Sequence, residues 1–283
     1  MLHKLLLQST ASVNVPAVWT IGNNMNSIRG HHASAGTLNA GLAITGHSDG
    51  GYATNTCEEY DGIGWAYGGN SSVSNALSAG CGKQTAALNF GGYAGYLTEE
   101  YDGTAWSRGG NLTVGRSSLG GCGTQTAGLS FGNSWHGESS YVTEEYNGNT
   151  WSRGGNLNIG RDFLGGGVGT QTAGLSFGGF DQNGVAGYGL TPFTEEYDGT
   201  TWFMGGNLLT ARRPAGAGTQ TAGLAIAGSY TNVTEEYNGT SWYASSPYIA
   251  VLDALSSCGS KGATLAFGGH NGVTYVTTTV EFS

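Results

Sequence analysis

Five pairs of adjacent glutamates are the residues of this chain that could most readily perform acid–base chemistry. Each pair is followed by a tyrosine and, within five further residues, by a tryptophan. Two carboxylates can serve as the acid and the base of glycoside hydrolysis. An active site needs only one such pair, whereas here five equivalent pairs recur, which indicates a structural role. The triplets end at Tyr60, Tyr101, Tyr146, Tyr197 and Tyr237, and the tryptophans are Trp65, Trp106, Trp151, Trp202 and Trp242.

Histidines offer a second possible chemistry, a transition-metal site. His31 and His32 are expected on the first strand of the first repeat. His47 and His270 follow the glycines of the first and last repeats, which become neighbours if the repeats close into a ring. The favoured interpretation is that the inner strand simply tolerates His31 and His32 and that the loop histidines are solvated. We therefore expect no metal and no cofactor. No Ser-His-Asp spacing, phosphate loop or zinc motif is present, and we expect that the protein is not an enzyme.

The repeat that carries these residues predicts short strands. Tyr197 and Tyr237 are 40 positions apart, and Tyr146 and Tyr197 are 51 apart. A unit recurring at such a period cannot bury its own apolar face and must stack on its neighbours. In the copy from Thr98 to Gly132, an Asp-Gly hairpin signal precedes the tryptophan, and a Thr-Gln-Thr turn joins two small-residue strands. The pattern favours four antiparallel strands per unit and an all-β protein.

The repeat resembles the kelch repeat, which forms the blades of propellers such as the central domain of galactose oxidase. The matching features are Tyr-Asp before tryptophan, an arginine about ten residues later, and Gly-Gly at the end of an apolar strand. The Gly-Gly pairs stand at Gly91-Gly92, Gly178-Gly179 and Gly268-Gly269. The resemblance extends from Trp19 to Phe282. It implies a propeller, and it says little about function because propellers host many activities.

The two ends of the chain predict how the ring closes. Val15 to Trp19 has the pattern of a lone outer strand, and Thr279 to Phe282 matches the Thr-Glu-Glu-Tyr strand without a following tryptophan. The N-terminal strand would then complete the last blade and remove an exposed sheet edge. We expect an all-β, six-bladed kelch-type β-propeller with four-stranded blades over residues 15–283, preceded by a lead segment, residues 1–14.

Cysteine usage and charge add little beyond the repeat. Cys81, Cys122 and Cys258 occupy one repeat position that holds alanine or valine elsewhere, and Cys57 replaces a threonine, so all four behave as small buried fillers. Neighbouring copies should lie beyond the roughly 7 Å limit for a disulfide, which predicts four free thiols. The formal charge of −9 comes mostly from the triplets. Only ten scattered lysines and arginines are present, which argues against nucleic acid as a partner.

The loop after the Gly-Gly strand is where the copies differ in length and chemistry. It is short in the second and fifth repeats and long at Asn133–Val142 and at Phe180–Phe193. Strand order places these loops on one face, opposite the uniform turns, and loops on a rigid scaffold commonly carry recognition. Trp135 either contacts a sugar or protein or covers the side of a blade. The candidate binding residues are Asn133, Trp135, His136, Phe180, Asp181, Asn183, Tyr188, Tyr230 and His270.

The N-terminal leucines have two possible roles. Leu2, Leu5, Leu6 and Leu7 form an apolar run that is too short for a signal peptide or a membrane span. We expect no membrane insertion. The leucines either dock the propeller onto a neighbouring subunit or add a strand over the sixth blade.

A second resemblance concerns function. Arrays rich in Gly, Thr, Asn and Ser with near-identical blades, such as Gly169–Gly179 beside Thr234–Trp242, look like propellers encoded by bacteriophages. That resemblance implies a non-enzymatic virion protein for decoration or host attachment, with virion proteins or host glycans and proteins as partners, and with homo-oligomers possible in the assembly. The alternatives are an extracellular or cytoplasmic module for protein–protein interaction and, as a minor one, a propeller-type oxidase or lyase.

Overall fold

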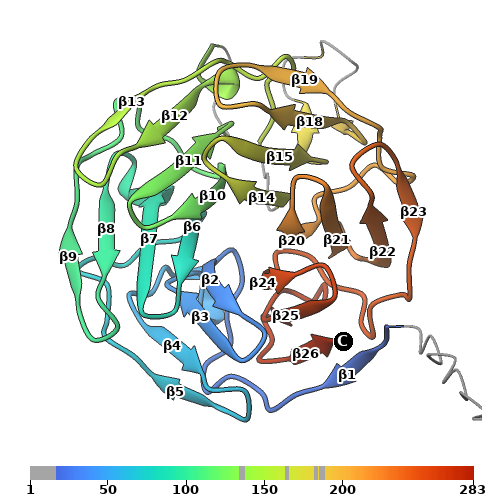
Figure 1. The fold of residues 1–283 in the computed structure, drawn as a ribbon. Helices are drawn as coiled ribbons and strands as arrows, with labels where there is room; N and C mark the ends of the chain where they lie inside the picture. The colour runs from blue at the N-terminus through green and yellow to red at the C-terminus, as the bar shows by residue number, and fades with distance from the viewer. Residues whose placement is uncertain (1–16, 134–137, 163–165, 182–183, 185–188) are drawn as a thin grey trace, which may run out of the picture.

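Six small antiparallel sheets surround a central axis in the computed structural model of this protein (Figure 1). The structure describes residues 17–133, 138–162, 166–181, 184 and 189–283. Each sheet has four strands, and the chain forms them in order around the ring, from the axis outward. The predicted six-bladed, all-β propeller is therefore confirmed.

The first three blades follow the repeat closely. Blade 1 consists of β2 (Ala33–Thr37), β3 (Ala40–Ile44), β4 (Cys57–Tyr60) and β5 (Trp65–Tyr67). Blade 2 consists of β6 (Ser78–Lys83), β7 (Ala86–Gly91), β8 (Thr98–Tyr101) and β9 (Trp106–Arg108). Blade 3 consists of β10 (Gly120–Thr124), β11 (Ala127–Phe131), β12 (Thr143–Tyr146) and β13 (Trp151–Arg153).

The last three blades include a small insertion and the closing strand. Blade 4 consists of β14 (Gly166–Thr170), β15 (Ala173–Phe177), β18 (Thr194–Tyr197) and β19 (Trp202–Met204), with a hairpin of β16 (Phe180–Asp181) and β17 (Gly189–Leu190) between its second and third strands. Blade 5 consists of β20 (Ala215–Thr219), β21 (Ala222–Gly228), β22 (Thr231–Tyr237) and β23 (Trp242–Ala244). Blade 6 consists of β24 (Ser256–Ser260), β25 (Ala263–Phe267), β26 (Thr279–Phe282) and β1 (Trp19–Ile21).

The N-terminal strand closes the ring, as the sequence predicted. β1 pairs antiparallel with β26, and Trp19 lies opposite Phe282. The two rings are 4.8 Å apart, and the Trp19 indole also packs on Tyr248 and donates to the Ser246 carbonyl. The expected strand began at Val15, which lies outside the described residues, and β1 begins at Trp19. Three short 3-10 turns, at Asp49–Gly51, Gly92–Ala94 and Glu138–Tyr141, are the helical elements among the described residues, and none could span a membrane.

The hydrophobic core is divided among the seams between blades. The seam between blades 3 and 4, for example, buries Leu129 and Phe131 from one blade against Tyr197 and Trp202 from the next. The second strand of each blade is buried on both faces along most of its length, and its sequence is mainly apolar, with a polar residue (Asn89, Ser130 or Ser176) in blades 2 to 4. The repeat therefore supplies each seam with the same apolar and aromatic residues.

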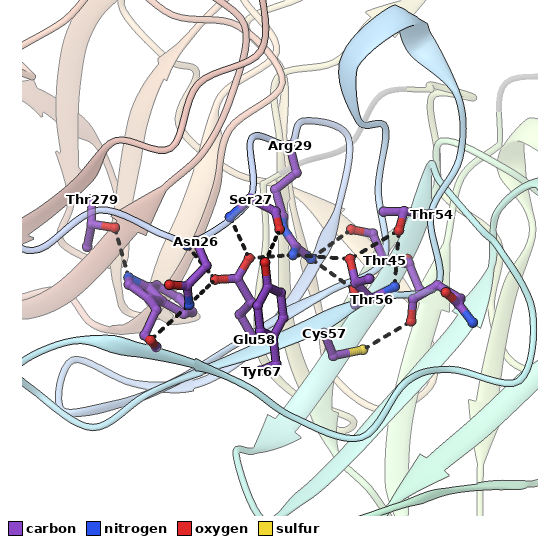
Figure 2. Close-up of polar contacts among 12 residues, drawn as sticks. Asn26, Ser27, Arg29, Thr45, Thr54, Thr56, Cys57, Glu58, Tyr67 and Thr279 are labelled. Atoms are coloured by element: carbon purple, nitrogen blue, oxygen red, sulfur yellow. Dashed lines mark hydrogen bonds and ion pairs between the residues drawn. The ribbon is translucent and has the colours of Figure 1, made fainter.

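In four of the five triplets, those of blades 1, 3, 4 and 5, the first glutamate lies in a buried ion pair inside its own blade. Figure 2 shows Arg29, from the connection that enters blade 1, beside Glu58 on β4. The nitrogen–oxygen distance is 2.6 Å, both side chains are fully buried, and Arg29 also donates to the Thr45 and Thr56 carbonyls. The equivalent pairs are Arg116–Glu144, Arg161–Glu195 and Arg212–Glu235.

The second glutamate bonds to the next blade. The Tyr197 hydroxyl of blade 4 donates to the Glu145 carboxylate of blade 3 at 2.6 Å. Equivalent bonds are Tyr60–Glu281, Tyr101–Glu59, Tyr146–Glu100 and Tyr237–Glu196. At the seam between blades 5 and 6, Phe282 stands in place of tyrosine, and Glu236 instead pairs with Lys261 at 3.1 Å.

The uniform turns and tryptophans also serve the seams. In blade 4 the Gln171 amide donates to the Gly128 and Tyr146 carbonyls of blade 3. The Trp202 indole of the same blade donates to the Thr143 hydroxyl of blade 3. The glutamine bond recurs at four of the six seams, and both kinds of side chain are turned toward neighbouring blades.

Blade 6 lacks the buried ion pair because apolar residues stand at both of its positions. Leu252 occupies the arginine position and Val280 the glutamate position, and both are buried in one apolar cluster. Breaking a buried pair by removing one partner typically costs about 3–5 kcal/mol, whereas an apolar replacement of both can be neutral. Blade 6 therefore supplies a natural template for a substitution experiment.

We predict that Arg116→Leu in blade 3 lowers the free energy of unfolding by about 3–5 kcal/mol, because Glu144 stays buried without its cation. The double variant Arg116→Leu/Glu144→Val should recover more than half of that loss. Denaturant titration of both variants measures the effect. A double variant that is no more stable than Arg116→Leu would contradict the prediction.

Candidate binding site at the mouth of the channel

The first strands of the six blades surround a narrow channel that holds a cavity of about 230 Å³. Its wall consists mainly of glycine, alanine, serine and cysteine from these inner strands. Cys81, Cys122 and Cys258 take the same register position, as predicted, and all four cysteines are free and buried. Burial raises the pKa of the Cys81 and Cys258 thiols to about 12, which keeps them protonated and unreactive.

A chain of three backbone hydrogen bonds joins blades 6, 1, 2 and 3 at one mouth of the channel. His31, Leu77, Ser118 and Ala254 occupy one repeat position ahead of their inner strands, and each has a positive φ between 51° and 59°. The Ser118 amide donates to the Leu77 carbonyl, the Leu77 amide to the His31 carbonyl, and the His31 amide to the Ala254 carbonyl. Side chains other than glycine disfavour this conformation, so the blade-to-blade bonds hold it in place. The mouth opens on the face that carries the variable loops.

A group of histidines and tyrosines lies at this mouth on four consecutive blades, 5, 6, 1 and 2. The His47 ring of blade 1 hydrogen-bonds through Nε2 to the Tyr93 hydroxyl of blade 2 at 3.1 Å, and through Nδ1 to the Tyr275 hydroxyl of blade 6 at 3.2 Å. The Tyr230 hydroxyl of blade 5 lies 3.2 Å from His270 Nδ1 of blade 6. We call these side chains the histidine–tyrosine cluster: His31, His47, Tyr93, Tyr230, His270 and Tyr275. The centroids of neighbouring rings in the cluster lie 5.0–6.5 Å apart.

An ion pair joins the cluster to the channel wall. Arg213 donates to Asp253 Oδ2 at 2.7 Å, and Asp253 Oδ1 accepts the Ser229 amide. Asp253 and His270 also exchange backbone hydrogen bonds of 3.0 and 2.8 Å. The mouth therefore offers hydrogen-bond donors and acceptors beside aromatic rings. The positive charge of Arg213 and the negative charge of Asp253 balance each other.

Burial holds His31, His32 and His47 in the neutral form near pH 7. Burial lowers the pKa of His31 to about 4, with a further contribution from the neighbouring His47 ring, and burial also lowers the pKa of His47. His32 lies behind the mouth against Phe267, where burial and then Arg29 lower its pKa well below the usual value. Neither ring nitrogen of His32 has a hydrogen-bond partner among the described residues. Neutral imidazoles can both donate and accept, which suits polar uncharged ligands.

The predicted binding residues divide into three groups. Tyr230 and His270 lie together in the histidine–tyrosine cluster. Asn133 is buried and shapes its loop, accepting the Ser117 amide and donating to the Ser139 hydroxyl, and the buried Asp181 accepts the Gly184 amide beside Phe180 on β16. The remaining candidates lie outside the described residues: Trp135, His136, Asn183, Tyr188, Leu2, Leu5, Leu6 and Leu7.

Sequence reasoning anticipated the cluster only in part. It placed His47 and His270 at one seam, and the structure confirms that neighbourhood through Tyr275, which contacts both rings. His31 and His32 were expected on the inner strand, whereas they precede β2, which begins at Ala33. Tyr93, Tyr275 and Asp253 were not singled out. These three residues differ from the repeat at loop positions, and this difference is the sequence feature that could have indicated them as binding residues.

Within the described part of the chain, no three His, Cys, Asp or Glu side chains gather as a metal site would require. No family model matches the chain, and no curated protein matches it either.

Histidines held neutral in the folded state predict a specific loss of stability in acid. Below pH 6.5, His31 and His32 bind protons in the unfolded chain but remain neutral in the folded protein. The free energy of unfolding therefore falls as the pH drops from 6.5 toward 4. Each such histidine contributes at most about 1.4 kcal/mol per pH unit. Urea titrations at pH 7 and pH 5 measure the loss.

The variant His32→Leu isolates one contribution. Leu119 and Leu255 stand at the same position in blades 3 and 6, so leucine should fit. We expect His32→Leu to be more stable than the wild type at pH 5 and to lose less stability between pH 7 and pH 5. An unchanged pH dependence would show that His32 does not titrate as inferred.

Proposed function

We propose that the protein is a non-enzymatic kelch-type binding propeller of a phage particle, and that it holds a host-surface glycan at the histidine–tyrosine cluster. The observation that carries the proposal is the contrast between the two kinds of aromatic residue in the chain. Tyrosines and tryptophans of the repeat are used in the seams. The tyrosines and histidines of the histidine–tyrosine cluster depart from the repeat and gather at one mouth of the channel.

The cluster has the chemistry that a sugar needs. Tyr93 is 59% and Tyr230 48% exposed, so their rings can pack on the apolar face of a sugar. The neutral His31 and His47 rings and the Arg213–Asp253 pair supply donors and acceptors for hydroxyl groups. Ligand sites typically combine apolar and aromatic walls with a few convergent polar groups.

The phage assignment is supported by the near-identical blades, the low content of charged residues and the single diversified face. Mass spectrometry of purified particles from the native source tests it directly. The protein should co-purify with the particles at stoichiometric abundance. Its presence only in the soluble fraction of the host would contradict the assignment.

A protein partner is the second candidate, and exposed apolar side chains favour it. Tyr52 and Val273 lie in the loops that follow β3 and β25, on the same face, and are 76% and 88% exposed. Aromatic residues are enriched in protein interfaces. Under this alternative the face would hold a cellular or virion protein instead of a glycan.

We predict that a glycan array with the wild-type protein identifies a bound saccharide and that Tyr230→Ala and His270→Ala weaken binding about tenfold or more, as loss of about 1.4 kcal/mol per contact requires. Tyr243→Ala is the matched control, because this partly exposed tyrosine lies on the outer strand β23. The glycan proposal fails if no saccharide is retained, or if Tyr243→Ala weakens binding as much as the cluster variants.

A further inference from the structure

Blade 2 breaks the rule that pairs a buried glutamate with arginine. Glu99 stands at the position of Glu144 and Glu195 and is fully buried. Asn75 replaces the arginine, and no Lys, Arg or His among the described residues forms an ion pair with Glu99. Its contacts are the Ser71 hydroxyl, which donates to Oε2 at 2.5 Å, and the Ser72 amide, which donates to Oε1 at 2.9 Å. Blade 6, by contrast, replaced both partners with apolar residues.

The neighbouring blades show what surrounds a guanidinium at this position. In blade 3, Arg116 Nη1 donates to the Gly132 and Val142 carbonyls. Its Nη2 donates to the Ser130 hydroxyl at 2.6 Å and to Glu144 at 3.1 Å. Four oxygens therefore surround one positive charge. Arg161 in blade 4 repeats the arrangement with Ser176 and Glu195.

Blade 2 keeps all four oxygens. Gly91 and Leu97 provide the two carbonyls, Glu99 provides the carboxylate, and Asn89 takes the position of Ser130, directly opposite the glutamate in the strand pair. Side chains at directly opposed positions of paired strands lie on the same side of the sheet. Asn89 is only 2% exposed, and its Oδ1 has no hydrogen-bond partner among the described residues. The shorter Asn75 side chain donates to the Gly91 carbonyl.

We propose that blade 2 binds an alkali cation, Na⁺ or K⁺, between the Glu99 carboxylate, the Asn89 amide oxygen and the Leu97 carbonyl, where the other blades hold a guanidinium. An uncompensated buried carboxylate is costly, and one positive charge balances it as the arginines do elsewhere. Carboxylate, amide and carbonyl oxygens are the ligands of hard cations. A water molecule could satisfy Asn89 but would leave the charge of Glu99 unbalanced.

Thermal unfolding in matched salts tests the site. Melting temperatures of the wild type are compared in NaCl, KCl and choline chloride at equal ionic strength, because choline is too large to enter. We expect a saturable rise of about 2–4 °C in at least one alkali salt. Equal melting temperatures in all three salts would overturn the proposal.

Two variants locate the effect. Asn75→Arg supplies the guanidinium that the other blades possess, so it should remove the difference between alkali and choline salts and raise the melting temperature in choline chloride. Glu99→Gln removes the charge at nearly constant shape and should also remove the difference. An alkali effect that persists in either variant would place the cation elsewhere and overturn the proposal.

Rubidium provides a direct readout that does not depend on the variants folding. Crystals grown in choline chloride and soaked in RbCl should show an anomalous peak in contact with Glu99 and Asn89. Density at that position without anomalous signal would indicate water only and would overturn the proposal.

Discussion

The hydrogen bond from a tyrosine of one blade to a glutamate of the preceding blade is the contact on which the ring depends. It spans five of the six seams, with oxygen–oxygen distances of 2.5–2.6 Å. At the remaining seam Lys261 replaces the tyrosine as the partner of Glu236. Because both glutamates of the triplet are engaged, one within its blade and one across the seam, the motif that looked most catalytic serves the architecture.

This use of the repeat separates structure from recognition. Where a copy has the repeat tryptophan and glutamine, these side chains bond to the adjacent blade, so changing them would loosen a seam. The loops on the face of the channel mouth lack these repeated seam residues, and the histidine–tyrosine cluster arises there from residues that depart from the repeat. A rigid ring of small sheets thereby holds side chains from four blades in fixed positions around the channel mouth.

Much of the fold could be predicted from the sequence, because periodicity reports directly on stacked blades. The missing tryptophan after Phe282 and the spare Trp19 revealed the closure. The Tyr197–Glu145 bond could not be predicted in the same way, since it joins residues 52 positions apart whose types are also compatible with a bond to backbone.

The candidate site was harder to predict than the fold. His47 and His270 could be placed at one seam, but Tyr93 and Tyr275 reach them through loop conformations that no period encodes. Asn75 was detectable in principle, because aligning the copies places it where four other blades have arginine. Its importance emerges only when Glu99 and Asn89 are seen to be buried together.

A double-mutant cycle on Glu145→Gln and Tyr197→Phe measures the seam contact most directly. If this bond holds blades 3 and 4 together, the two single changes should be coupled by about 1–3 kcal/mol in the free energy of unfolding, as expected for a partly buried hydrogen bond to a carboxylate. Effects that add to within about 0.5 kcal/mol would contradict the central role given to this bond.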